Sequence, residues 1–283
     1  MNTLSADFSR ELLDAIDRIQ AFPVSVQGIL KLTRDSTSSP RDLVDVIQRD
    51  PIVTIKVLRV VNSAYYSLPR QITSVEHAVV FLGFNTIKNL ALGIAALSLA
   101  PAQLHPALDS RAYLHHSLAT AAITRQLGAR FPAIDANDFF IAGLLHDFGK
   151  VVLAQVMPAQ FRKALEYALW HEVSLHSALI EITGIDQSEV GAMLLEHWRF
   201  PAELVDGIRH QYARNDNAPT LSVCIQAANQ ICKHAGVDFA ANDKPQVFSA
   251  PMEQVFGGTL ETVMESLGDM AEVLQSAMHF SDL

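Results

Sequence analysis

The stretch Gly143-Leu144-Leu145-His146-Asp147-Phe148-Gly149-Lys150 places an adjacent His-Asp pair at the end of an apolar helical run. Neighbouring residues on a helix point about 100° apart, so the pair can share one ion only if other helices supply further ligands. Taken alone, the pair also fits a buried histidine beside a polar helix end. The flanking glycines allow other backbones to approach closely, which favours a packed polar site.

An upstream partner for this pair lies where His115 and His116 open a second helical run. One helical face cannot present two adjacent side chains equally, so we take His116 as the candidate ligand and His115 as the spare. A histidine pair on a helix is by itself unremarkable, and His116 matters only in company with His146 and Asp147. These three residues form the predicted metal site.

Helical spacing and helix punctuation run through the whole chain. Ser39-Pro40 and Asp50-Pro51 each combine a capping side chain with a proline, which predicts two short helices. Gly184 and Gly236 are typical helix stops. The inward faces of the two short helices are expected to carry Leu43, Val44, Ile47, Ile52, Ile55 and Leu58. Because no alternating run of strand length is found, the sequence predicts an all-α fold.

Composition and charge exclude several classes of protein. With 283 residues and 49% apolar content the chain can bury a sizeable core. Its net charge of −9, without any Lys/Arg cluster, argues against a nucleic-acid partner. The longest apolar run, residues 90–102, is too short for a bilayer and no signal peptide is seen. Cys224 and Cys232 are about 12 Å apart on one helix, too far to bridge. We expect a cytoplasmic protein with free thiols and no membrane partner.

The proline-containing linker at residues 100–109 divides the predicted domain. The first 100 residues carry 10 Lys+Arg and 9 Asp+Glu; subtraction from the totals of 21 and 30 leaves 11 and 21, a net charge of −10. We expect an N-terminal helical lobe at 1–100 and a lobe of longer helices at 101–236. Residues 237–283 are expected to form a loop, as far as Phe256, and then one amphipathic helix that packs on the domain.

Several motifs in order resemble a known family. Arg-x-x-x-His-His-Ser at 111–117, followed by the stretch at 143–150, resembles the HD superfamily of metal-dependent phosphohydrolases. The first hundred residues resemble, more narrowly, the HD-related output domain (HDOD) of bacterial signalling proteins. That resemblance rests on Phe22-Pro23, Ile47-x-x-Asp50-Pro51, Leu58-x-x-x-Asn62-Ser63-Ala64-Tyr65-Tyr66 and Ile72-x-Ser74-Val75-x-x-Ala78-Val79-x-x-Leu82-Gly83. It implies a two-lobed helical fold, with an HD-type bundle in the second lobe, and a role in signal transduction.

The resemblance also implies an incomplete set of metal ligands. Gln187 stands where related sequences often have His, Asn229 stands where the hydrolases have Asp, and His210 is at most one of a usual pair. Neutral amides lack the charge that offsets the dehydration of a divalent ion. No catalytic residue is therefore assigned, and no cofactor is expected beyond weakly bound Zn, Fe or Mn. His171, His176 and His197 are expected at the surface or at helix ends.

Three functions remain open from the sequence. The leading prediction is a non-enzymatic regulatory module of bacterial signalling that contacts a protein partner. The second is a phosphohydrolase that acts on a nucleotide or cyclic dinucleotide through His116, His146 and Asp147, and the third is a sensor that binds a nucleotide-like ligand without turnover. Tyr and Arg often anchor interfaces, so part of the partner surface is expected at Tyr65, Tyr66 and Arg70. Asn62 is expected to hold the lobe together by hydrogen bonds.

Overall fold

The computed structural model describes residues 28–29, 31–32, 38–62, 66, 68–97, 110–213, 218–239, 246–270 and 274. Within these ranges every regular element is a helix and no strand occurs, so the predicted all-α fold is confirmed. The linker at 100–109 lies outside the described residues, as does Tyr65. The domain boundaries drawn from the sequence stay predictions.

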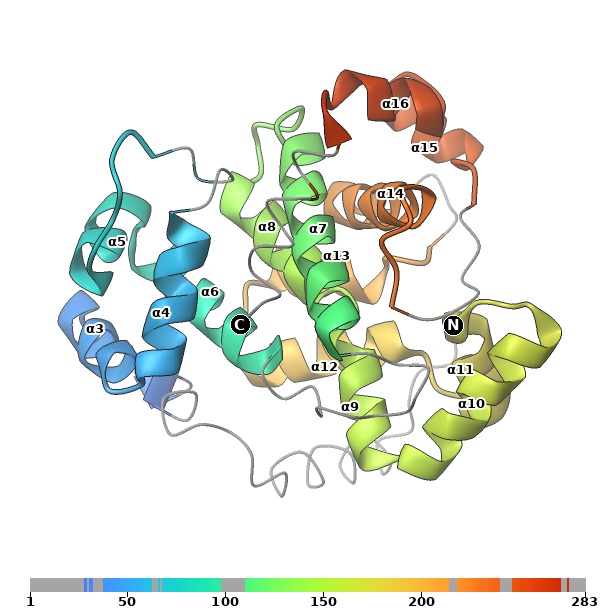
Figure 1. Ribbon diagram of the computed structural model, residues 1–283, viewed down its shortest axis with the longest axis horizontal. Helices are drawn as coiled ribbons and strands as arrows, with labels where there is room; N and C mark the ends of the chain where they lie inside the picture. The colour runs from blue at the N-terminus through green and yellow to red at the C-terminus, as the bar shows by residue number, and fades with distance from the viewer. Residues whose placement is uncertain are drawn as a thin grey trace.

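Four helices form one end of the molecule, on the left of Figure 1: α3 (Pro40–Gln48), α4 (Pro51–Val61), α5 (Val75–Leu82) and α6 (Phe84–Leu97). The predicted starts of α3 and α4 are confirmed. Ser39 and Asp42 form a reciprocal capping box, and the Asp50 carboxylate accepts from the backbone N–H groups of Ile52 and Val53.

The buried face of α4 differs from the prediction. Its buried residues are Val53, Val57, Val60 and Val61, while Ile52 and Ile55 are 65% and 50% exposed. The helix is apolar on more than one side, so its periodicity does not decide which stripe faces inward. The contacts of α4 with α3, α5 and α6 select the valine stripe.

Asn62 ties the end of α4 to the approach to α5. Its side-chain amide donates to the carbonyls of Leu58 and Ile72 at 2.8 and 2.6 Å, and its Oδ1 accepts from Ile72 N–H at 2.6 Å. These bonds close the intervening loop onto the helix. The structural role expected for Asn62 therefore agrees with its contacts.

The second group of helices surrounds the His-Asp pair. It comprises α7 (Ser110–Gly128), α8 (Ala136–Leu145), α9 (Phe148–Val156), α10 (Pro158–His171), α11 (Leu175–Thr183), α12 (Gln187–His197), α13 (Ala202–Arg209) and α14 (Thr220–His234). The long helix α7 packs along both α8 and α14, and α9 packs on α12 (Figure 1). Gly143 lies against Ala121 and the carbonyl of Thr120, and Gly149 lies against the backbone of Gln187. Both glycines thus permit the close helix contacts that the sequence suggested.

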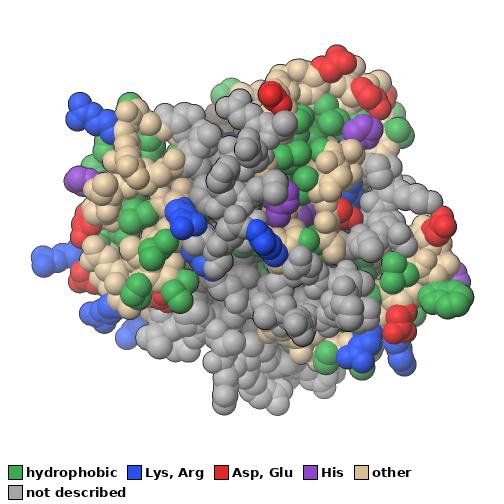
Figure 2. Space-filling model, in the orientation of Figure 1, with side chains coloured by type: hydrophobic (Ala, Val, Ile, Leu, Met, Phe, Trp, Pro, Cys, Tyr) green, Lys and Arg blue, Asp and Glu red, His purple; other side chains and the backbone are tan. Residues whose placement is uncertain are grey.

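The C-terminal part contains one helix more than expected. Besides α16 (Leu260–Ser266), residues assigned to a loop form α15 (Ala250–Phe256), which begins after Ser249 with a proline at its second position. The Phe256 ring packs near Phe131 and Phe248, with centroids 6.3 and 5.9 Å away. This burial fixes a short helix whose own periodicity is too brief to identify. Figure 2 shows acidic side chains over α15 and α16, in keeping with the acidic second part of the sequence.

The core accounts for a long apolar segment in the second group of helices. Residues 136–156 are long and apolar enough to cross a membrane, yet 89% of their most apolar window is buried inside the protein. Cys224 and Cys232 are free and buried on α14, which confirms the expected unpaired thiols.

Candidate metal centre

Three helices position the predicted ligands. His116 lies on α7, His146 follows the last residue of α8, and Asp147 precedes the first residue of α9. The backbone leaves helical geometry at Asp147, with φ −101° and ψ 8°. This break lets two adjacent side chains approach one another, so that His146 Nε2 lies 3.2 Å from Asp147 Oδ2.

The three side chains form one compact buried group. The Nε2 atoms of His116 and His146 are 3.2 Å apart, and His116 Nε2 is 3.7 Å from Asp147 Oδ2. All three residues are at most 1% exposed. Ligand atoms bound at about 2.0–2.2 Å around one tetrahedral ion lie roughly 3.3–3.6 Å from each other. The spacing in the group therefore fits a single divalent ion.

Backbone carbonyls fix the orientation of both imidazole rings. The Nδ1–H of His116 donates to the carbonyl of Val237 at 2.9 Å, and the Nδ1–H of His146 donates to that of Gly143 at 2.8 Å. A carbonyl can only accept, so each Nδ1 carries a proton. When both rings are neutral, as metal binding requires, their Nε2 lone pairs face the centre of the group, as in metal sites whose outer hydrogen bonds set the tautomer.

Lys150, on α9, places a positive charge beside the carboxylate of Asp147. Lys150 Nζ lies 2.8 Å from Asp147 Oδ1, and the lysine side chain is itself buried. Burial alone raises the pKa of Asp147, but His146 and Lys150 hold it well below its ordinary value. Burial and the neighbouring His146 lower the pKa of His116 to about 3, so this ring is neutral at neutral pH. The Lys150 ammonium thus offsets the charge of Asp147, but neither carboxylate oxygen has a hydrogen bond of good geometry among the described residues.

Phe239, which the sequence did not predict as part of the site, places its aromatic ring against the His-His-Asp group. The Phe239 ring centroid lies 5.3 Å from that of His116 and 5.0 Å from Lys150 Nζ, and the ring also packs edge-on against Tyr113. Phe239 falls in the segment after α14 that the sequence assigned to a loop. An aromatic residue within that polar loop was the available signal, but nothing local indicates what it covers.

The remaining sequence candidates lie around the group. Gln187 is fully buried; its Oε1 accepts from His176 Nδ1 at 2.9 Å, and its Nε2 has no hydrogen-bond partner among the described residues. His176 lies in the first turn of α11, in agreement with the expected helix-end position, and it is mostly covered and stacks on Tyr212 at 3.7 Å. The His210 ring instead bonds the carbonyl of Asp206 on its own helix.

Asn229 lies away from the end of α14 that meets His116. Thr120 on α7 donates to Cys232 on α14. His116, which precedes Thr120 in the sequence, donates to Val237, which follows Cys232, so α7 and α14 run antiparallel here. Asn229 precedes Cys232 by three residues and therefore lies farther along α14 from His116. Its buried Oδ1 has no hydrogen-bond partner within the described part of the chain.

Tyr66 and Arg70, two of the three residues expected to face a partner, differ in burial. Tyr66 is only 6% exposed, lies 5.9 Å from Phe140 and packs under the Arg125 guanidinium, so its assignment to a partner-facing surface is wrong. The ring is drawn inward because its aromatic area gains more from the core than from solvent. Arg70 is exposed, and its role stays a prediction.

Comparison with solved structures supports the fold. An HDOD domain protein of unknown function from Geobacter sulfurreducens matches with a TM-score of 0.72 and 21% identity over 97% of both chains. A candidate phosphohydrolase from Shewanella amazonensis SB2B matches with a TM-score of 0.70 and 22% identity over 95% of this chain and 97% of that one. A candidate signal transduction protein from Marinobacter aquaeolei VT8 has a TM-score of 0.69 and 26% identity, over 99% of this chain and 66% of its own.

Sequence comparison gives the family. An uncharacterised protein of Treponema pallidum (strain Nichols) is 23% identical over 218 residues, 75% of this chain. This chain covers 41% of that relative's length. The family model of the HDOD domain matches residues 19–214, which include His116, His146 and Asp147. The chain therefore belongs to the HDOD domain family.

Proposed function

We propose that the protein is a regulatory module of bacterial signal transduction that acts by contact with a protein partner and does not hydrolyse phosphoesters. One observation carries the proposal: the His-His-Asp group is enclosed and already balanced by the buried Lys150 ammonium, 2.8 Å from Asp147. A phosphoester substrate needs an open approach and unpaired positive charge. The Phe239 ring covers one side of the His-His-Asp group, and the Lys150 ammonium is paired with the Asp147 carboxylate.

The metal fit belongs to this proposal as a retained feature. His116, His146 and Asp147 are the residues that would hold Zn, Fe or Mn, and such an ion would supply Lewis-acid chemistry. The chain's own part is to orient the two rings through Val237 and Gly143 and to exclude water with Phe239. In the proposed module these features hold α7, α8 and α9 together.

A hydrolysis assay tests the absence of turnover. The full chain is incubated with Mn²⁺, Zn²⁺ or Fe²⁺ and offered bis(4-nitrophenyl) phosphate, nucleotides and cyclic dinucleotides. Product formation should equal that of the His146→Ala variant, with His197→Ala, at the end of α12, as a matched histidine control. Turnover that His146→Ala abolishes and His197→Ala retains would refute the proposal.

A metal-dependent phosphohydrolase is the second candidate. It is favoured by the inward-facing Nε2 lone pairs of His116 and His146, which are arranged as in a metal site. This function would require the Phe239 segment to move aside. Under this candidate, Phe239→Ala should raise turnover in the presence of Mn²⁺, and His116→Ala should remove it.

The partner surface is proposed on the α3–α6 end. This part of the molecule exposes Arg70 and four large apolar side chains, and exposed apolar groups of this size often mark interaction sites. The apolar residues are Ile52, Ile55, Val80 and Phe81. Arg70→Glu and Phe81→Ser should each abolish capture of the partner from the native host and leave the melting temperature unchanged. Lys163→Glu on α10 is the matched surface control, and equal capture by all three variants would exclude this surface.

A further inference from the structure

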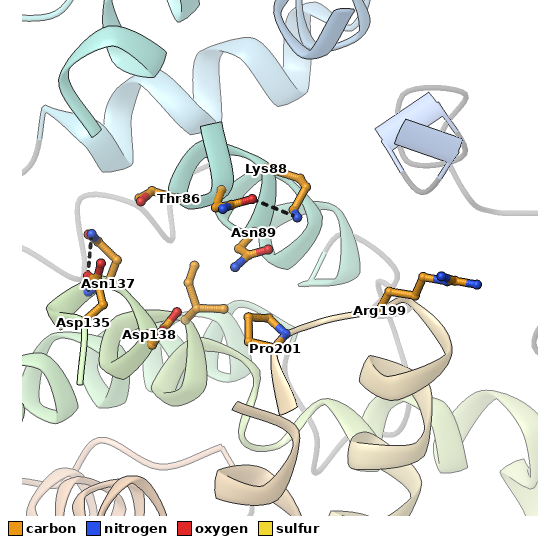
Figure 3. Close-up of a pocket in the computed structure, with 10 residues that line it drawn as sticks. Thr86, Lys88, Asn89, Asp135, Asn137, Asp138, Arg199 and Pro201 are labelled. Carbon is orange, nitrogen blue, oxygen red and sulfur yellow. Dashed lines mark hydrogen bonds between the residues drawn. The ribbon is translucent and has the colours of Figure 1, made fainter. Parts of the chain in front are cut away.

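A polar cavity lies between α6 and α8. None of His116, His146 and Asp147 lines it. Its volume is about 320 Å³ (Figure 3). Lys88 and Asn89 reach it from α6, and Asp138 reaches it from α8. Ile141 and Pro201 supply apolar lining. The cavity thus joins the α3–α6 end of the molecule to the helix that leads to His146.

The side chain of Asn89 indicates that the cavity takes a polar ligand. Asn89 is only 4% exposed, yet its Oδ1 has no hydrogen-bond partner among the described residues. Figure 3 shows the amide extending from α6 towards Asp138 and Pro201. A buried acceptor without a donor is costly, so a donor in the cavity would stabilise the site.

Lys88 and Asp138 carry opposite charges on the cavity walls and are not paired with each other. Asp135 also lines the cavity, and its carboxylate accepts from the backbone N–H and the side-chain amide of Asn137. Lys88 Nζ donates to Asn85 Oδ1 at 3.2 Å, and no ion pair to a carboxylate is found for it within the described ranges. Burial lowers the pKa of Lys88, whereas burial, together with Asp135 and Glu203, raises the pKa of Asp138. Each shift favours the neutral form. Lys88 Nζ also lies 5.7 Å from the centroid of the Phe84 ring, and neither Lys88 nor Asp138 forms an ion pair with an opposite charge among the described residues. Arg199 also lines the cavity, but Figure 3 shows its side chain directed away.

We propose that this cavity binds a small zwitterion, a free amino acid, with its ammonium group at Asp138 and its carboxylate at Lys88. The Asn89 Oδ1 accepts a further hydrogen bond from the ammonium group. A simple cation would pair with Asp138 and leave Lys88 uncompensated, and a simple anion would do the reverse. A ligand that carries both charges pairs with both Asp138 and Lys88.

The size of the cavity restricts the ligand to a small one. Ligand pockets commonly measure about 300–1,000 Å³, and this cavity is near the lower limit. A short side chain could lie against Ile141 and Pro201. Because Asp138 is on α8, which ends just before His146, the bound amino acid would brace α6 against the helix that leads to the His-Asp pair.

Calorimetric titration of the full chain with L-alanine, ethylamine and propionate tests the proposal. Ethylamine keeps only the ammonium group of L-alanine, and propionate keeps only its carboxylate. L-alanine should bind and raise the melting temperature. Ethylamine and propionate should bind at least about tenfold more weakly, since each leaves one wall charge unpaired. If L-alanine fails, the other standard amino acids are titrated in the same way.

Variants locate the binding. Asp138→Asn and Lys88→Gln should each weaken L-alanine binding at least about tenfold, while the exposed Asp45→Asn and Lys163→Gln serve as charge-matched controls. Melting curves of all four variants report whether they are folded. The proposal fails if no standard amino acid binds, if ethylamine or propionate binds as tightly as L-alanine, or if the folded Asp138 and Lys88 variants bind unchanged.

Discussion

His116 and His146 face each other with their Nε2 atoms 3.2 Å apart, and each ring uses its Nδ1–H on a backbone carbonyl. The pair is held from behind, so neither ring can rotate without the loss of a buried hydrogen bond. The geometry suits a cation, and the nearest cation is the ammonium of Lys150, on the far side of the shared Asp147. We therefore expect competition between Lys150 and a metal ion for Asp147 to determine whether the group binds metal.

Metal content is the first measurable consequence. Protein purified without added metal should contain well under one Zn, Fe or Mn per chain, because Asp147 is already neutralised by Lys150. A chelator should then barely change the melting temperature, since a tightly bound ion would have stabilised the folded state by mass action. Elemental analysis and melting curves with and without chelator measure both quantities. One firmly bound ion per chain would contradict this expectation.

The buried ion pair predicts a partial rescue between two substitutions. Asp147→Ala leaves the Lys150 ammonium buried without its carboxylate, which should cost about 3–5 kcal/mol of the free energy of unfolding. Adding Lys150→Met removes the stranded charge and should recover at least about 1 kcal/mol. Urea denaturation of the parent protein, Asp147→Ala, Lys150→Met and the double variant gives the double-mutant cycle. A double variant no more stable than Asp147→Ala would show that Lys150 does not depend on Asp147.

Gly149 should not tolerate a methyl group. A Cβ at this position would overlap the backbone carbonyl of Gln187 on α12, and backbone cannot rotate away as a side chain can. Gly149→Ala should therefore cost about 1–3 kcal/mol or more by forcing α9 from α12. Gly93→Ala is the matched control, because its Cβ would meet only the ends of the Leu144 and Leu145 side chains and no backbone atom, and it should gain up to about 1 kcal/mol in helix propensity. Equal stability of the two variants in urea would argue against the close α9–α12 contact.

The two thiols should be unreactive in the folded protein. Burial raises the pKa of Cys224 and that of Cys232 to about 12 in each case, so almost no thiolate exists at pH 8. A disulfide reagent such as Ellman's should label neither cysteine in native buffer and both in guanidinium chloride. Reactivity should appear in the native state only as the pH rises towards 12. Rapid labelling at pH 8 without denaturant would mean that α14 opens readily.

Local features determined much of the secondary structure. The capping side chains of Ser39 and Asp50 act on backbone groups two or three residues away, so the starts of α3 and α4 could be predicted from the sequence. The packed site at the His-Asp pair could likewise be predicted from the sequence, because the glycines on both sides of the pair allow other helices to approach closely. The order of motifs also indicated the HDOD family.

Tertiary structure decided which surfaces were buried and what surrounds the His-Asp pair. The inward stripe of α4, the burial of Tyr66 and the position of Phe239 over His116 all depend on partners far away in the sequence. Helix periodicity gives the direction of a side chain relative to its own axis, but not which neighbouring surface it meets. Lys150 stands in the sequence beside the pair, yet only the fold buries it with Asp147 and so gives its charge a structural role. Burial raises the strength of that interaction, and burial is a property of the assembled helices, not of the sequence read residue by residue.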